Sequence, residues 1–144
     1  MKILINRIKS GKITINNKVK ASLDKGLAVF VGIEVDDTES NLITAAKKII
    51  NMRLFENGSG KLSGSVKEKN YGILCIPNFT LCASTKKGRR PSFEKAMKPD
   101  AAKKMFAKFM VLLQNEIDLQ SGVFGADMAI DLELDGPVNI TVKV

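Results

Sequence analysis

Residues 26–37, GLAVFVGIEVDD, decide the fold class of this chain. Within them, residues 27–33 form a continuous apolar run that is rich in β-favouring side chains. A run without polar alternation is typical of a central strand that is buried on both faces. The Asp36-Asp37-Thr38 triplet that follows offers a helix N-cap. We therefore expect a buried strand that leads directly into a helix.

Two helices are predicted. The first runs from this N-cap to about Met52, because apolar residues recur there at helical spacing. The second begins with Pro99 at its first position and Asp100 in its first turn. Its buried face is expected to hold Ala102, Met105, Phe106, Phe109, Leu112 and Leu113.

Strands account for the remaining regular structure. A hairpin is expected at the start, with its turn at residues 16–18, and a further strand is expected over residues 73–82, with a bend at Pro77. Residues 128–144 are expected to form two alternating strands that are joined by residues 135–137. Many short strands with two helices predict an α+β fold in one domain, residues 1–144: a mixed, mostly antiparallel sheet curled toward a barrel, with two packed helices.

The most restrictive feature of the composition is the absence of histidine. It excludes Ser-His-Asp and Cys-His activation of a nucleophile, and it excludes imidazole as a general base. Cys75 and Cys82 are expected to be buried reduced thiols rather than zinc ligands. We expect no metal and no cofactor. An enzyme of this sequence must therefore use backbone groups, a hydroxyl, a lysine or the substrate itself.

The expected location is the cytoplasm, with no membrane partner. The longest apolar stretch, Leu27–Ile33, is too short to cross a bilayer. The first ten residues mix charges with apolar side chains and lack the apolar region of a signal peptide.

Positive charge is concentrated in one part of the chain. The net charge is +8, and residues 86–108 hold nine Lys or Arg against two acids, whereas residues 109–144 hold one lysine against six acids. A one-sided basic field favours a polyanion such as nucleic acid. Within the basic part, Lys86, Lys87, Arg89 and Arg90 precede a rigid Pro91, and we expect this loop to contact phosphate.

Three residues or pairs leave alternatives open. Arg7 shares a strand face with apolar residues, so it is either buried on backbone carbonyls or bent out to solvent at an edge. Gly136-Pro137 is either a simple turn or a cis bond that aims two successive carbonyls in one direction. Thr80 is either a nucleophile, with Lys86 or Lys87 as its base, or a β-branched residue that faces the core.

Taken together, these segments resemble the D-aminoacyl-tRNA deacylase family. The likeness covers nearly the whole chain, and the order and spacing of its motifs make it specific. The motifs are NRI around Arg7, GLAVFVGIEVDD (26–37), NMRLFENGSGK (51–61), NFTLCASTKKGRRPSF (78–93), SGVFGADM (121–128) and DGPV (135–138).

The resemblance implies a homodimer that hydrolyses the ester between a D-amino acid and the terminal adenosine of tRNA, and that also acts on glycyl-tRNA. In this family a Gly-cisPro pair from one subunit reaches into the pocket of the other and excludes L side chains. Gly136 and Pro137 match that pair, Arg7 matches the arginine that holds it, and Met128 lies on the strand that leads to it.

The resemblance also implies how catalysis proceeds without histidine. Phe79 and Thr80 match the family's pocket strand, whose backbone amides stabilise the oxyanion while the ribose 2′-hydroxyl of the substrate assists. The residues expected to bind tRNA are Lys86, Lys87, Arg89, Arg90 and Phe93, and no DNA partner is expected.

Four positions depart from the family pattern. The pocket strand usually begins Ser-Gln-Phe-Thr-Leu, but Pro77 and Asn78 stand here, and Leu134 and Asn139 replace two polar residues that flank the Gly-Pro pair. Animal paralogues that act on L-alanyl-tRNA also carry proline at the start of this strand. An altered-specificity deacylase for small L-aminoacyl esters, a catalytically weak tRNA-binding homologue and a small-ester hydrolase that uses Thr80 and lysine therefore stay as alternatives.

Overall fold

A computed structural model describes residues 1–86 and 88–144 of the chain, and Lys87 lies outside the described residues. The elements, in chain order, are β1 (Lys2–Ile15), β2 (Lys18–Leu23), β3 (Gly26–Gly32), α1 (Glu39–Asn51), β4 (Arg53–Glu56), β5 (Leu62–Ser65), β6 (Gly72–Pro77), the 3₁₀ helix η1 (Phe79–Cys82), α2 (Pro99–Gln114), β7 (Leu119–Ser121) and β8 (Ala129–Lys143).

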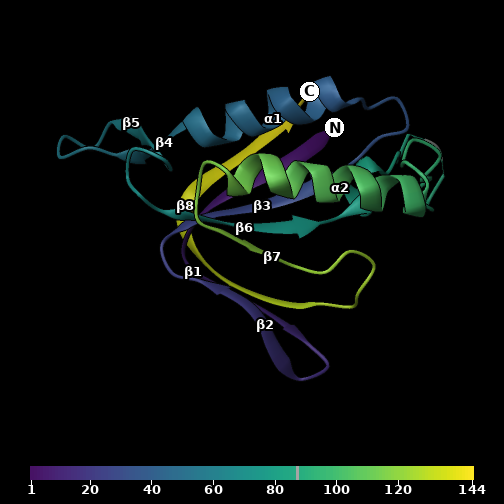
Figure 1. Ribbon diagram of the computed structural model, residues 1–144, viewed down its shortest axis with the longest axis horizontal. Coiled ribbons are helices and arrows are strands. Elements are labelled where there is room, and N and C mark those ends of the chain that lie inside the picture. The colour runs from purple at the N-terminus through teal and green to yellow at the C-terminus, as the bar shows by residue number, and fades with distance from the viewer. Residues whose placement is uncertain (87) are drawn as a thin grey trace.

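The main sheet is mixed and six-stranded, in the order β2-β1-β3-β6-β7, with β8 also paired to β1. The β3–β6 and β6–β7 pairs are parallel, and β1 is antiparallel to β2, β3 and β8. Figure 1 shows both helices on one side of this sheet, while β2 and the adjoining parts of β1 and β8 curl away from them. The fold is the expected α+β arrangement, with a barrel-like mixed sheet and two packed helices.

The length of β1 produces the curl. Its first half pairs with β3, its second half pairs with β2, and β8 follows nearly all of it on the other side. A small apolar cluster fills the inside of the curl, and it consists of Ile8, Ile13, Ala21, Ala28, Leu74 and Ile76. The predicted hairpin turn is confirmed, because Asn16 and Asn17 have the positive φ angles that such a turn requires.

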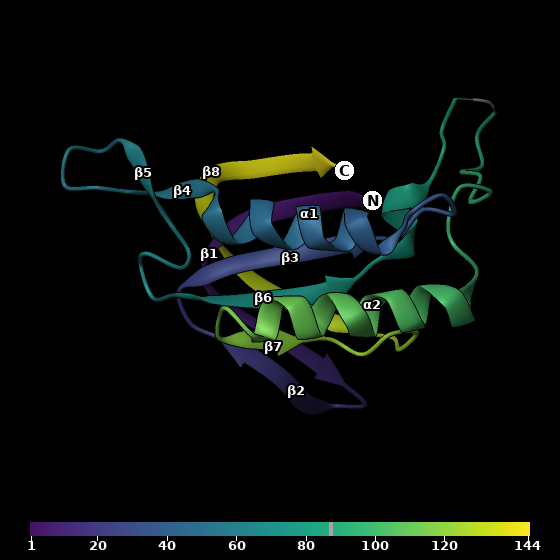
Figure 2. The same cartoon turned by 45° about the horizontal axis from the view of Figure 1, so that its top comes forward.

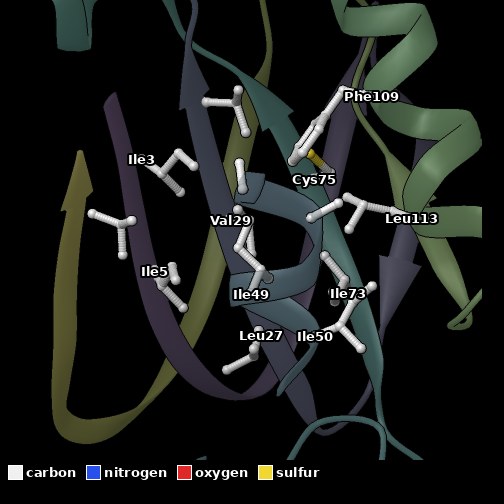
Figure 3. Packing of buried hydrophobic residues seen from close by; sticks show 14 of the residues in the cluster. Ile3, Ile5, Leu27, Val29, Ile49, Ile50, Ile73, Cys75, Phe109 and Leu113 are labelled. Carbon is white, nitrogen blue, oxygen red and sulfur yellow. The ribbon is translucent and has the colours of Figure 1, made fainter. Parts of the chain in front are cut away.

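The larger core lies between the sheet and the two helices (Figure 3). β3 is buried almost throughout, as its apolar run predicts, and it contributes Leu27 and Val29 to this core. The helices contribute Ile49 from α1 and Phe109 and Leu113 from α2. Burying a side chain of this size contributes about 1.5–3 kcal/mol, so this layer holds α2, whose first turns line an apolar pocket described below, against the sheet.

Two predicted strand boundaries are wrong. The strand expected over residues 73–82 ends at Pro77, and the chain then turns into η1. Proline has no N–H for a sheet ladder, which ends the pairing there. Residues 128–144 do not form two strands either, because β8 is continuous over Ala129–Lys143. Its pairing with β1 persists on both sides of Gly136-Pro137.

No helix among the described residues is long and apolar enough to span a bilayer.

Candidate active site

The 3₁₀ helix η1 is held closely against the end of β3. Asn78 N donates to the carbonyl of Val31 at 2.8 Å. A Cβ atom at Gly32 would lie 3.0 Å from the carbonyl oxygen of Asn78 and 2.9 Å from Sγ of Cys82. A side chain at residue 32 would therefore push η1 away. The glycine allows Phe79 and Thr80 to stand at the edge of the sheet.

Most backbone N–H groups of this segment are already occupied. The side chain of Asn78 accepts a hydrogen bond from Thr80 N at 3.1 Å, and Leu81 N donates to the carbonyl of Asn78 at 3.3 Å. Pro77 has no N–H to offer. Among the described residues, no acceptor bonds the Phe79 N–H. The geometry therefore leaves Phe79 N–H as the backbone donor of this segment that is available to a ligand.

Phe79 stands between two pockets. A groove of about 340 Å³ is lined by Phe30, Ile76, Pro77, Asn78, Phe79, Gly125, Ala126, Asp127, Met128 and Ile130. A second pocket of about 420 Å³, here called the aromatic pocket, is lined by Val31, Ile33, Phe79, Phe93, Ala96, Met97, Lys98, Pro99, Ala102, Phe106, Phe124 and Gly125. The groove has both polar and apolar walls, and the aromatic pocket is almost wholly apolar. A ligand with one apolar part and one partly polar part can therefore place one part on each side of Phe79.

Met128 is brought to the groove by a second close approach. A Cβ atom at Gly122 would lie 2.6 Å from Sδ of Met128 and 3.5 Å from Cδ of Pro77. The thioether consequently packs over the glycine beside the end of β6. The structure thus places two predicted site residues, Phe79 and Met128, in one groove.

The hydroxyl of Thr80 is bonded to Asn78 and not to Lys86, one of its two predicted lysine bases. The Thr80 side chain is exposed, and its hydroxyl donates to Oδ1 of Asn78. No hydrogen bond joins this hydroxyl to Lys86 among the described residues, and Lys87 lies outside them. The alternative that Thr80 is a core-facing strand residue is wrong, because the residue is exposed and lies on η1.

Arg7 is buried, and it is bonded to backbone carbonyls as the first of its two interpretations predicts. Its side chain is 7% exposed. Nη1 donates to the carbonyl of Leu54 at 2.9 Å, and Nε donates to the carbonyl of Asp135 at 3.2 Å. The carboxylate of Asp135 lies 3.0 Å from Nε, and Oε1 of Glu56 lies 3.5 Å from Nη2. Carboxylates on two sides compensate the cost of burying the guanidinium.

Gly136 and Pro137 lie on a wide bulge beside Arg7. On β1 only Arg7 separates Asn6 from Ile8, but their partners on β8, Asn139 and Leu134, are separated by residues 135–138. The peptide bond between Gly136 and Pro137 is cis, and both residues are exposed. They line neither the groove nor the aromatic pocket of their own chain.

Four of the five predicted tRNA contacts, Lys86, Arg89, Arg90 and Phe93, lie on or directly after one loop that leads to the aromatic pocket. Lys86, Arg89 and Arg90 are exposed, and Ser84 and Ser92 pair across the base of their loop. Phe93 packs edge-to-face against Phe79, with ring centroids 5.2 Å apart. The loop therefore leads directly to the residue that separates the two pockets. Lys87 cannot be placed, because it lies outside the described residues.

The two cysteines are buried free thiols, as predicted. Desolvation raises the pKa of the Cys75 thiol well above its ordinary range. Desolvation, with the charge of Glu34 second, raises the pKa of Cys82. Both thiols are therefore protonated near neutral pH, and neither lines the groove or the aromatic pocket.

Sequence reasoning missed several residues that complete the site. Phe124, Gly125 and Lys98 line the aromatic pocket, and Leu54 and Glu56 support Arg7. Phe124 and Gly125 stand in the SGVFGADM motif, which could have indicated a pocket. The role of Leu54 depends on its carbonyl group, and no side-chain pattern indicates that.

Comparison with known proteins defines the class of this site. Residues 4–143 match the model of a family described as D-Tyr-tRNA(Tyr) deacylase. A D-aminoacyl-tRNA deacylase of Carboxydothermus hydrogenoformans is 39% identical, and the match covers 100% of both chains. Proteins of this class are ester hydrolases. The chain belongs to the D-Tyr-tRNA(Tyr) deacylase family.

Solved structures agree on the fold. A protein titled c-Myc DNA Unwinding Element Binding Protein is 34% identical, with a TM-score of 0.96, and the match covers 100% of this chain and 99% of that one. A probable eukaryotic D-amino acid tRNA deacylase is 18% identical, with a TM-score of 0.84, over 99% of this chain and 98% of that one. At that identity the second likeness shows the fold alone.

Proposed function

We propose that the protein acts as a homodimer in the cytoplasm, where it hydrolyses D-aminoacyl-tRNA and glycyl-tRNA and excludes L-aminoacyl-tRNA by steric selection. The products are the free amino acid and intact tRNA. In this proposal Gly136 and Pro137 of the partner subunit close the pocket, and their carbonyls leave no room for an L side chain. The protein would thereby remove D-amino acids from tRNA before translation uses them.

The two pockets divide the substrate between them. The aminoacyl group would lie in the groove between Phe79 and Met128, and the terminal adenosine would lie in the aromatic pocket. An apolar pocket with three phenylalanine side chains besides Phe79 suits a nucleobase, because aromatic rings stack on bases of any sequence. The ester would then lie beside Phe79, where the two pockets meet.

The backbone provides the electrostatic part of the catalysis. Water adds to the ester carbonyl, and the Phe79 N–H donates to the oxygen that becomes negatively charged. The tetrahedral intermediate then collapses, the bond to the ribose oxygen breaks, and that oxygen takes up a proton. The neighbouring 2′-hydroxyl of the substrate can assist this transfer, so no histidine is needed.

We call Gly136-Pro137 the gate, because this pair would close the pocket of the other subunit. The observation that supports it is the position of the bulge at residues 135–138. Gly136 and Pro137 in it are exposed, Asp135 is bonded to Arg7, and none of the four residues lines either pocket of its own chain. An exposed Gly-Pro pair whose neighbour Asp135 is anchored by Arg7, and which lines neither pocket of its own subunit, suits a role in a second one. Leu134, which precedes the bulge and is 48% exposed, would also be covered by a partner.

Mixed dimers test this arrangement. The Arg7→Lys protein has an intact pocket with a loosened gate, and the Asn78→Ala protein has a damaged pocket with an intact gate. If the gate acts across the interface, unfolding and refolding the two proteins together creates one site with both parts intact. The ratio of D-tyrosyl to L-tyrosyl hydrolysis should then rise above that of the same two proteins mixed without unfolding.

A gate that acts within its own subunit predicts a different result. The refolded mixture would then show only the sum of the D-tyrosyl and L-tyrosyl rates of the two separate proteins. Light scattering at micromolar concentration provides the second check, since a monomer would contradict the shared site.

A further inference from the structure

We propose that Lys98, Lys103 and Lys104 form a phosphate-binding track on α2, which guides the unpaired 3′ end of the tRNA away from the aromatic pocket. This inference rests on the proposed function, because it takes the terminal adenosine to lie in that pocket. The partner is a single-stranded RNA end that is recognised through its phosphates.

The track begins at the pocket itself. Lys98 lines the aromatic pocket and directly precedes Pro99, the first residue of α2. Ala102 on the same helix lines the pocket too, while its neighbours Lys103 and Lys104 are exposed. At a rise of 1.5 Å per residue, Lys104 lies about 9 Å along the helix from Lys98. At 3.6 residues per turn, Lys103 is rotated by about 100° and Lys104 by about 200° from Ala102. The track therefore leads from the pocket around the outer side of the helix, away from the ester.

The lysines of the track have no carboxylate partner, in contrast to several lysines elsewhere. Lys9 and Lys12 pair with acidic residues of β8 at 3.7 and 3.3 Å. Within the described residues, no ion pair involves the three lysines of the track, even though Asp100 stands in the same first turns. Further along α2, Lys108 pairs with Glu39. The unneutralised charge therefore ends about two turns into the helix.

The surroundings of the track favour a single strand over a duplex. Figure 2 shows that the loop before α2 projects at the end of the molecule where this helix begins. Phe93 on that loop is 38% exposed and stands at the pocket rim, where a base can stack on it. Lysines bind phosphates as point charges and do not read base edges. Such a track would accept the ends of different tRNAs alike.

The test compares two double variants that lose the same charge. The variant Lys103→Ala/Lys104→Ala removes two cations from the track, and Lys18→Ala/Lys20→Ala removes two exposed lysines of β2 that form no ion pair among the described residues. The affinity for uncharged tRNA is measured at several salt concentrations. With about 0.7 counterions released per single-strand phosphate contact, the slope of log affinity against log salt should fall by about 1.4 in the track variant. It should stay at the wild-type value in the β2 variant.

Three results would overturn the track. Equal losses of slope in both variants would mean that net charge alone matters, and no loss in either would mean that α2 does not contact the RNA. A loss that appears with whole tRNA, but not with a short single-stranded RNA of the same 3′ sequence, would place the contact on the paired stem. Because binding is measured with uncharged tRNA, these results are separate from hydrolysis. Wild-type protein that neither binds tRNA nor hydrolyses its D-aminoacyl form would contradict the proposed function itself.

Discussion

Arg7 contacts Asp135 through both its backbone and its side chain: Nε lies 3.2 Å from the carbonyl oxygen and 3.0 Å from Oδ2 of that residue. Asp135 directly precedes Gly136, so the guanidinium fixes the chain where it enters the bulge. The same guanidinium donates to the carbonyl of Leu54 on β4. One buried cation thus joins the bulge to a second element, and the position of Gly136-Pro137 depends on it.

Replacing Arg7 by lysine should loosen the gate. Lysine keeps the charge but cannot reproduce a planar fork that bonds Leu54 and Asp135 together. A lost hydrogen bond to a charged group costs about 1.5–3 kcal/mol, so we expect the ratio of D-tyrosyl to L-tyrosyl hydrolysis to fall by about tenfold or more. The ratio of initial rates with the two esters measures this. The matched control is Lys12→Ala, which breaks an exposed ion pair between the same two strands and should leave the ratio unchanged.

Asn78 should matter through its acceptor oxygen. Its Oδ1 holds Thr80 N, which keeps η1 in shape and orients the Phe79 N–H. Asn78→Ala loses this cap, at a cost of about 1 kcal/mol, and kcat should fall about fivefold or more with little change in KM. Asn78→Asp retains an acceptor and should keep most of the activity. Equal activity in wild type, Asn78→Ala and Asn78→Asp would mean that the shape of η1 does not affect catalysis.

Gly32 should be intolerant of a side chain. Gly32→Ala places a methyl group 3.0 Å from the carbonyl oxygen of Asn78, so η1 must shift and carry Phe79 with it. Deacylation should therefore decrease by at least tenfold. Gly58→Ala is the control, because a Cβ atom there would meet nothing within 4 Å. If Gly32→Ala were as active as Gly58→Ala, the close approach would have no catalytic importance.

The core under α2 should dominate stability. Phe109 is 0% exposed, and Phe109→Ala should lower the free energy of unfolding by about 3–5 kcal/mol. Val111 on the same helix is 57% exposed, and Val111→Ala should change that free energy by less than about 0.5 kcal/mol. Urea unfolding of both variants gives the comparison. Similar losses in the two would mean that α2 does not pack as described.

The Cys75 thiol should make stability depend on alkaline pH. Burial raises its pKa in the folded protein above the ordinary value of 9.0, so only the unfolded chain loses this proton readily. Its contribution to stability is complete below pH 9.0 and is lost as the pH rises toward the pKa of the folded state. The stability difference between wild type and Cys75→Ala should therefore shrink above pH 9. A difference that stays constant up to pH 10.5 would contradict the burial.

The sequence was sufficient for the features that depend on side-chain pattern. The apolar run at residues 27–33 predicts a buried central strand, and Thr38 and Pro99 mark where the helices begin. It was insufficient where backbone geometry decides. Nothing in the alternation of residues 128–144 shows that β8 continues through a bulge, and the pattern around Pro77 does not separate a bent strand from a 3₁₀ helix.

The residues of the candidate site likewise fall into those that the sequence predicts and those that only the folded backbone shows. The family motifs lead to Phe79, Met128 and the Gly136-Pro137 pair, because these are recognised as residue types in order. The availability of one N–H at Phe79 follows from where three neighbouring amides donate, and the support of Arg7 by Leu54 follows from a carbonyl. Both are properties of the folded backbone, so they become visible only in three dimensions.

The most direct test of this account is the deacylation rate of one tRNA charged in turn with D-tyrosine, L-tyrosine, glycine and L-alanine. We predict rapid hydrolysis of the D-tyrosyl and glycyl esters, with the L-tyrosyl and L-alanyl esters left intact. Hydrolysis of L-alanyl-tRNA at a comparable rate would contradict steric selection and would indicate an altered-specificity deacylase. Binding of tRNA without hydrolysis of any of the four esters would contradict the enzyme itself.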